Sequence, residues 1–127
     1  MKKRVLIIED NEQNIYMLTY LLESQDFQVI QARSGVEGIE MAIESKPDFI
    51  LLDIQLPEMD GYTVAAKIRE CEILKQIPII VVTSYAMTGD KEKALASGAD
   101  GYIEKPIDPE TFIDQMNSFL PSHLTSK

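Results

Sequence analysis

The sequence predicts an α/β protein built on a doubly wound parallel sheet of five strands. Five short apolar runs rich in Val and Ile alternate with longer stretches of helical period, which is typical of parallel strands joined by crossover helices. Two of the runs, FILLD and IIVVT, are apolar up to their last residue, as expected when helices cover both faces of a sheet. The third observation is size, because 127 residues with 45% hydrophobic content suffice for one domain with its own core.

The expected strands are the runs RVLII, FQVIQA, FILLD, IIVVT and GYIE, each followed by a helix. FQVIQA alternates apolar and polar residues, which suits a strand at the edge of the sheet. The fourth helix is expected to end at Gly98, a residue suited to a left-handed cap. The five helices are expected to begin near Glu12, after Ser34 and Gly35, after Gly61, near Asp90, and at an N-cap formed by Asp108 with Pro109 in the first turn.

The spacing of apolar residues predicts which side of each helix faces the core. Cys71, the single cysteine, continues the apolar spacing of the third helix, so we expect it to pack in the core rather than to react. Residues 1–121 are expected to form the domain, and SHLTSK, residues 122–127, a short disordered tail. The other side chains expected to face the core are Met17, Leu18, Leu21 and Leu22; Ile39, Ala42 and Ile43; Val64 and Ile68; and Phe112, Ile113, Met116, Phe119 and Leu120.

Charge and composition exclude several classes of partner. The chain has 21 acidic and 12 basic residues, and its net charge of -9 argues against binding to nucleic acid or to an anionic membrane. It contains no run of about 18 uncharged apolar residues, and the apolar stretch after MKKR is too short for a signal peptide. We therefore expect a cytoplasmic protein whose partners are proteins, small ligands or cations.

Polar and charged residues stand where the expected strands end. In a doubly wound sheet the carboxyl ends of the strands meet at one edge, where such proteins bind ligands. A strand-end aspartate alone is more often a helix cap or turn former, and Asp10 could simply cap the first helix. The combination carries more weight, because clustered carboxylates repel one another unless a cation or a function compensates. The residues concerned are Glu9, Asp10, Asp53, Thr83, Ser84, Lys105 and Pro106.

These residue types fit Mg²⁺ binding and phosphoryl transfer. No His or Cys stands at the strand ends, and a few oxygen ligands with room for water favour magnesium over zinc. A carboxylate beside the metal can attack phosphorus in line, while a lysine and a hydroxyl hold other phosphoryl oxygens. The pattern predicts an aspartate that becomes phosphorylated, in a protein that catalyses its own phosphorylation and dephosphorylation and is not otherwise an enzyme.

Four motifs, IIEDN, LLDIQLPEMDGY, VVTSYA and GYIEKPID, follow the order and spacing of one family. Through them the chain, from about Lys2 to Leu120, resembles the receiver domains of two-component response regulators. The resemblance implies a flavodoxin-like sheet of order 2-1-3-4-5 with five helices. It also implies a signalling switch of a two-component system or phosphorelay, which accepts a phosphoryl group from a sensor histidine kinase or a histidine phosphotransfer protein.

For the metal and the nucleophile, the resemblance implies roles for four residues. Asp53 is the phosphoacceptor. Asp10, Asp53 and the backbone carbonyl of Gln55 are the direct protein ligands of Mg²⁺. Glu9 stands where the family often has aspartate, and it acts through a metal-bound water.

For the phosphoryl group, the resemblance adds two catalytic residues to Asp53, namely Lys105 and Thr83. Lys105 pairs with Asp53 and then with the phosphoryl group, and a cis peptide bond is expected before Pro106. Thr83 hydrogen-bonds one phosphoryl oxygen, and the backbone amide of Ser84 hydrogen-bonds another.

The resemblance also implies a conformational switch. In the family, the threonine moves toward the phosphoryl group and an aromatic residue on the last strand turns inward; Thr83 and Tyr102 occupy these positions. The alternative is a half-buried tyrosine that keeps one rotamer. The switch would remodel the face formed by the fourth helix, the fifth strand and the fifth helix, where relatives bind downstream proteins. A monomer or a weak dimer is expected.

Alternatives from other classes fit the residues less well. A haloacid-dehalogenase-like phosphatase also uses an aspartate nucleophile with Mg²⁺, but in a D-x-D motif after its first strand. Here Gln55 stands two residues after Asp53, where that motif has its second aspartate. A flavodoxin-like cofactor carrier needs a glycine-rich phosphate loop where this chain has EDNEQN. Within the receiver family, the open alternatives to a stand-alone switch are a domain excised from a hybrid histidine kinase and a receiver that docks constitutively.

Two large residues predict slower hydrolysis of the phosphorylated state than smaller residues would allow. Gln55 and Tyr85 stand where family members tune the access of water to the acyl phosphate. Replacing both with alanine should therefore speed spontaneous hydrolysis, measured as the decay of the phosphorylated protein after removal of the phosphodonor. An unchanged decay rate would show that these side chains do not shield the acyl phosphate.

Overall fold

One sheet of five parallel strands forms the centre of the protein, in a computed structural model that describes residues 2–84 and 89–125. The strand order is β2-β1-β3-β4-β5, which confirms the fold class predicted from the sequence. Each strand coincides with one of the expected apolar runs. The strands are β1 (Arg4–Ile8), β2 (Gln28–Ala32), β3 (Phe49–Leu52), β4 (Ile79–Thr83) and β5 (Gly101–Glu104).

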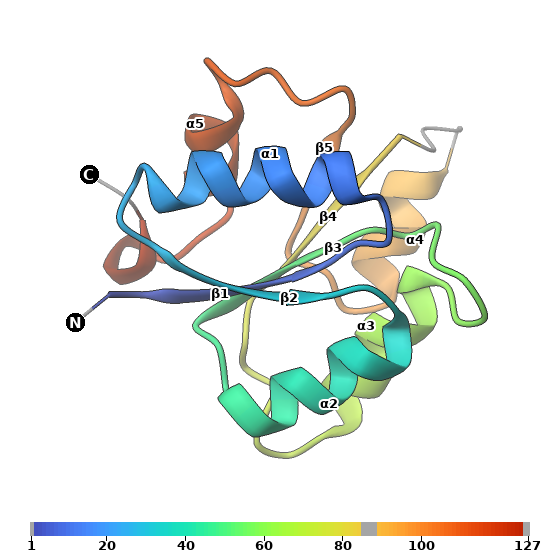
Figure 1. Cartoon of the computed structure of the whole chain (residues 1–127). Coiled ribbons are helices and arrows are strands. Elements are labelled where there is room, and N and C mark those ends of the chain that lie inside the picture. The colour runs from blue at the N-terminus through green and yellow to red at the C-terminus, as the bar shows by residue number, and fades with distance from the viewer. Residues whose placement is uncertain (1, 85–88, 126–127) are drawn as a thin grey trace.

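Helices cover both faces of the sheet (Figure 1). Within the described ranges, no helix combines the length and the apolar character needed to cross a membrane. The first face carries α1 (Glu12–Glu23) and α5 (Phe112–Asn117), and the second carries α2 (Gly35–Ser45), α3 (Gly61–Glu70) and α4 (Asp90–Ala96).

The strands alternate between two separate apolar cores. Val5 and Ile7 of β1 pack in the core with residues of α1 and α5, whereas Leu6 and Ile8 pack in the core with residues of α2, α3 and α4. All residues of β3 and β4 are buried, while β2, at the edge, is mostly half-exposed, as its alternating sequence predicts. The interior strands are therefore fixed from both sides, and their carboxyl ends share that rigidity.

Side-chain caps define where three of the helices begin. The side chains of Asn11, Ser34 and Asp60 each accept a hydrogen bond from the backbone amide three residues later. These bonds satisfy amides that lack a partner in the first helical turn. The cap of α1 is Asn11 and not Asp10, so the Asp10 carboxylate remains available for the site at the carboxyl edge of the sheet.

The structure corrects one predicted core residue on α2. Ile43 was expected to face the core but is 44% exposed. The buried positions of α2 include Gly38 and Ala42, and a Cβ atom at Gly38 would lie 2.5 Å from the Cδ1 atom of Ile8. Glycine thus brings this side of the helix against β1, which turns Ile43 outward.

The last helix is shorter than predicted. It begins at Phe112, and the Asp108 carboxylate instead accepts a hydrogen bond from the Glu110 amide within the preceding turn, at 2.9 Å. The predicted N-cap at Asp108 is therefore wrong, because the chain first forms a separate tight turn. Phe119 lies beyond the end of α5 but still packs on β5, where a Cβ atom at Gly101 would lie 2.3 Å from its ring.

The predicted disordered tail is wrong for its first residues. Ser122–Leu124 forms one turn of 3-10 helix, and Leu124 packs into the core under α1 and α5 with 4% of its surface exposed. Burying a leucine side chain contributes about 2 kcal/mol, which offsets part of the entropy lost when this turn is ordered. Residues 126 and 127 lie outside the described part of the chain.

Candidate functional site

The predicted site residues meet at the carboxyl edge of the sheet. Glu9, Asp53 and Lys105 directly follow β1, β3 and β5, and Thr83 is the last residue of β4. The amides of Glu9, Asp53 and Lys105 each donate to a backbone carbonyl of the neighbouring strand, at 2.9 to 3.0 Å. The pairing of the strands therefore continues to these residues and fixes their positions.

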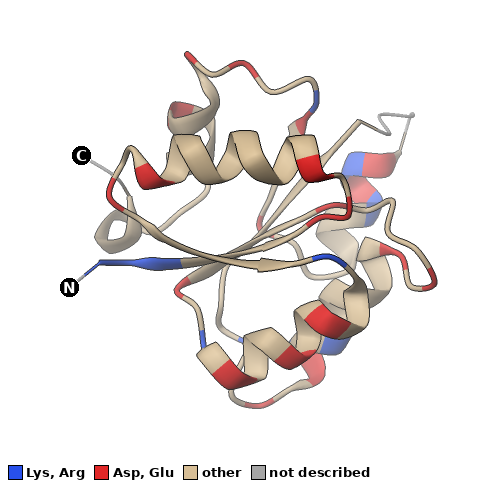
Figure 2. Cartoon of the chain, viewed as in Figure 1, with Lys and Arg blue, Asp and Glu red and all other residues tan. Residues whose placement is uncertain are grey.

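Three carboxylates form the centre of the site. Glu9, Asp10 and Asp53 place carboxylate oxygens within 4.8 Å of one another, and acidic residues are visible along this edge in Figure 2. Glu9 is 2% exposed and Asp53 is 6% exposed, whereas Asp10 is exposed to solvent. Buried carboxylates at this separation repel one another, and an oxygen-only donor set open to water on one side suits Mg²⁺. The residues present thus fit the expected ion.

The backbone of Gln55 lies beside the nucleophile Asp53. Its amide donates a hydrogen bond of 3.3 Å to Oδ1 of Asp53, and its side chain is exposed. The loop folds back closely at this point, because the Gly61 amide donates to the carbonyl of Ile54 at 2.8 Å. A Cβ atom at Gly61 would lie 2.5 Å from the carbonyl oxygen of Asp53, so only glycine fits here without a shift.

Lys105 reaches the carboxylates, but its main partner is not the expected one. Its Nζ atom donates to Oε1 of Glu9 at 2.6 Å and lies 3.7 Å from Oδ2 of Asp53. The predicted pairing with Asp53 is thus the looser of two ion pairs. The lysine side chain is 10% exposed, and the peptide bond to Pro106 is cis, as predicted.

The electrostatics of the site raise the pKa of Asp53. The pKa rises from an ordinary value of 3.8 to about 6, first because the carboxyl is buried and second because the Glu9 carboxylate is near. Lys105 and the amide of Gln55 act in the opposite direction but do not cancel it. Without a further cation, an ionised Asp53 is therefore a costly group to hold in this site.

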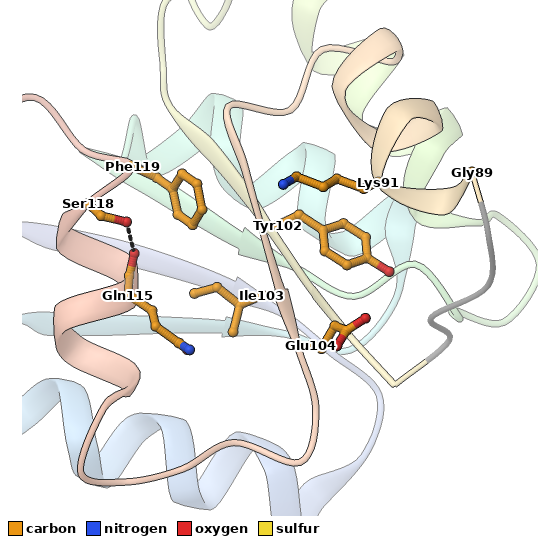
Figure 3. A pocket seen from close by; sticks show the side chains of 8 residues that line it. All are labelled: Gly89, Lys91, Tyr102, Ile103, Glu104, Gln115, Ser118 and Phe119. Carbon is orange, nitrogen blue, oxygen red and sulfur yellow. Dashed lines mark hydrogen bonds between the residues drawn. The ribbon is translucent and has the colours of Figure 1, made fainter.

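Thr83 and Tyr102 lie on the two neighbouring strands β4 and β5. Thr83 is fully buried, Ser84 is exposed, and Tyr85 lies outside the described residues. Tyr102 is half-buried, and burial raises its pKa, with Asp90 and Glu104 adding to the effect. The ring also lines a cavity of about 510 Å³ between α4, β5 and α5 (Figure 3).

One contact beside Tyr102 could not be found from the sequence. The Tyr62 hydroxyl donates to a carboxylate oxygen of Asp90 at 3.3 Å, and the Nζ atom of Lys93 lies 5.1 Å from the centre of the Tyr62 ring. Burial and the nearby Asp90 raise the pKa of Tyr62 to about 12, so its hydroxyl stays protonated. The only signal in the sequence is an aromatic residue directly after Gly61, which does not name a partner on another helix.

The fold and the site together define a flavodoxin-like α/β protein with an acidic site at the carboxyl edge of its sheet. The family model of the response regulator receiver domain matches residues 5–117, and the chain belongs to this family. Among curated proteins, the polar-differentiation response regulator DivK from Brucella ovis is 43% identical over 120 residues, covering 94% of this chain and 98% of the relative. DivK from Brucella anthropi is 42% identical over the same length.

Solved structures agree with the fold and with the kind of ion. The chemotaxis response regulator CheY4 of Vibrio cholerae has a TM-score of 0.89 and 27% identity, and the match covers 94% of this chain and 100% of CheY4. The receiver domain of a sensor histidine kinase from Pseudomonas aeruginosa has a TM-score of 0.85 and 29% identity, covering 94% and 98%. That structure holds a magnesium ion coordinated in its active-site cleft.

The raised pKa of Asp53 predicts that Asp53→Asn stabilises the metal-free protein. Because the folded-state pKa of about 6 lies above 3.8, the native state binds the Asp53 proton more tightly, and stability falls as the pH rises from about 4 to about 6. The full difference corresponds to roughly 3 kcal/mol. In EDTA at pH 7.5, urea unfolding should show Asp53→Asn to be more stable by about 1 to 3 kcal/mol, and the gain should shrink toward pH 4.

Glu44→Gln is the matched control, since Glu44 is an exposed carboxylate on α2. It should leave the free energy of unfolding unchanged within about 0.5 kcal/mol at each pH. Equal stability of Asp53→Asn and wild type from pH 4 to pH 8 would contradict a costly charge at this position.

Proposed function

We propose that the protein is a phosphorylation-dependent switch of a two-component system or phosphorelay. It accepts a phosphoryl group on Asp53 from a sensor histidine kinase or a histidine phosphotransfer protein. The observation that carries this proposal is the placement of the Asp53 carboxylate, 6% exposed, between two further carboxylates and the Lys105 ammonium. A nucleophile, a cation-binding oxygen set and a counter-charge for phosphate are thus brought together.

The carboxylates of Asp10 and Asp53, with the carbonyl of Gln55, would hold Mg²⁺ directly, and Glu9 would act through a metal-bound water. When bound, the ion neutralises the carboxylates and the charge of the phosphoryl oxygens. Asp53 supplies the oxygen that forms the new bond to phosphorus, while the bond from phosphorus to the donor nitrogen breaks and the histidine leaves as imidazole. The backbone of β3 holds Asp53 in place for in-line attack, because both faces of that strand are packed.

Lys105, Thr83 and Ser84 act on the transferred group. The Lys105 ammonium, 3.7 Å from Oδ2 of Asp53, is close enough to pair with a phosphoryl oxygen on that carboxylate. The Thr83 hydroxyl and the Ser84 amide, at the end of β4, supply further hydrogen bonds. With these residues, the protein catalyses its own phosphorylation and dephosphorylation, and it turns over no separate substrate.

The output is a change in protein binding at the face formed by α4, β5 and α5. Tyr102 lines the cavity on this face, and Thr83 lies on the neighbouring strand, two residues beyond the partner of Tyr102 in the register. A phosphoryl group shifts the equilibrium between two states of this face only by its different interaction free energy with each state. The downstream partner is a protein, since a net charge of -9 disfavours nucleic acid and anionic membranes.

Asp53→Asn should abolish phosphorylation by a small phosphodonor. Incubation of wild type with acetyl phosphate and Mg²⁺ should add one phosphoryl group by intact mass, labile to hydroxylamine as an acyl phosphate is, and EDTA should prevent it. Glu58→Gln, which changes an exposed carboxylate in the same loop, is the control and should keep the label. Labelling of Asp53→Asn to the wild-type extent would sink the proposed site.

The switch predicts that a phosphoryl mimic changes the surroundings of Tyr102. With Mg²⁺ and beryllofluoride, the ring signals of Tyr102 should move in NMR spectra, and Thr83→Ala should remove most of this response. Tyr16, 76% exposed on α1, is an internal control whose signals should stay in place. Unchanged Tyr102 signals in the saturated wild type would favour a receiver that docks constitutively.

A further inference from the structure

Lys105 is held closer to Glu9 than to the nucleophile. Its Nζ atom is 2.6 Å from Oε1 of Glu9, a short charge-assisted hydrogen bond, but 3.7 Å from Oδ2 of Asp53, beyond hydrogen-bond distance. The second Glu9 oxygen, Oε2, accepts from the Asn11 amide at 3.2 Å. Both oxygens of this buried carboxylate therefore already have donors.

The reach of the glutamate side chain makes this arrangement possible. Aspartate is shorter by one carbon–carbon bond, about 1.5 Å, so a carboxylate on that residue would end near 4 Å from the same ammonium. At that separation the charges still attract, but no hydrogen bond forms. The close contact with Lys105 is thus a property of glutamate at position 9 and not of an acidic residue in general.

We propose that Glu9 is a positioning residue that keeps the Lys105 ammonium beyond hydrogen-bond distance of Asp53 until a cation binds. While Oε1 accepts the short bond from Lys105, part of the negative charge of Glu9 is compensated, and the ammonium beside it repels a cation. A cation that binds at Glu9 therefore weakens its hold on the lysine, and the loosened ammonium is left with Asp53, its other partner in the site. Cation binding and delivery of Lys105 to the nucleophile become one coupled step.

The use of this coupling rests on the proposed function, because Lys105 serves there to pair with the phosphoryl group on Asp53. Without bound cation, the lysine is hydrogen-bonded to Glu9 and makes only the looser ion pair with the nucleophile. With bound cation, both positive charges are present together. The site is then competent for phosphoryl transfer only when the cation is bound.

A double-mutant cycle on Mg²⁺ affinity tests the proposal without any phosphodonor. The four proteins are wild type, Glu9→Asp, Lys105→Met and the double variant, titrated with MgCl₂ by calorimetry. Glu9→Asp conserves charge but loses the close contact, so it should lower the Kd for Mg²⁺ by about fivefold when Lys105 is present. In the Lys105→Met background no lysine has to be released, and the same substitution should change Kd by less than about twofold.

The exposed pair of Glu72 and Lys75 provides the matched control. Its atoms are 3.2 Å apart at the opposite edge of the sheet, and Glu72→Asp with Lys75→Met should leave Kd unchanged. Unfolding in EDTA gives a second measurement, in which Glu9→Asp should lower Tm with Lys105 present and change it little in the Lys105→Met background. This measurement keeps the test decisive if one variant is too unstable to titrate.

Three outcomes would overturn the proposal. The first is an equal effect of Glu9→Asp on Kd in both backgrounds, which would mean that Glu9 acts on the ion by charge or reach alone. The second is an unchanged Kd with Lys105 present, and the third is no binding of Mg²⁺ by wild type. Failure of the cycle is distinct from failure of the proposed function, since labelling of Asp53 by acetyl phosphate is measured separately and can succeed when the cycle fails.

Discussion

The ion pairs of Lys105 with Glu9 and Asp53 partly compensate buried carboxylates that repel one another. Two of the three carboxylates are almost fully buried, and burial of like charges costs free energy in proportion to how poorly they are compensated. One ammonium reduces that cost without removing it, which is why the pKa of Asp53 stays at about 6 despite a lysine nearby. The site is electrostatically incomplete in the protein alone, and a divalent cation is the kind of ligand that completes it.

The rest of the fold makes this arrangement tolerable. The strands that lead to Glu9 and Asp53 are almost wholly buried, and their side chains divide between two cores that lie on opposite faces of the sheet. Displacing Asp53 would disturb packing on both faces at once, including the loop that closes on its carbonyl through Gly61. Repulsion among the carboxylates therefore acts on groups that cannot move apart, and its effect appears as a shifted pKa instead of a changed backbone.

The sequence predicted the parts of the fold that depend on local patterns. The apolar runs predicted the positions of all five strands, and the polar residues at the strand ends predicted which side chains meet at the site. Errors arose where tertiary packing decides, as at Ile43, which close packing of Gly38 on β1 turns outward, and at Leu124, which finds a place in the core after the last helix. The choice of Glu9 as main partner of Lys105 also escaped prediction, because it depends on a difference of 1.1 Å between two distances, 2.6 and 3.7 Å, across residues far apart in the chain.

The two edges of the sheet use similar residues to opposite effect. At the amino edge, Arg69 donates to the carbonyls of Gly98 and Ile77 and to the Asp100 carboxylate, at 2.7 to 2.9 Å, and Asp100 also accepts from the amide of Ile79. Charge and hydrogen-bonding capacity are balanced there, so the contact joins α3, β4 and the start of β5 without creating a demand for any ligand. At the carboxyl edge, three carboxylates face one lysine, and the excess of negative charge persists because the strands that carry these residues are equally rigid. Since both edges belong to one sheet, the difference cannot come from the fold class, and it arises from the few residues that follow each strand.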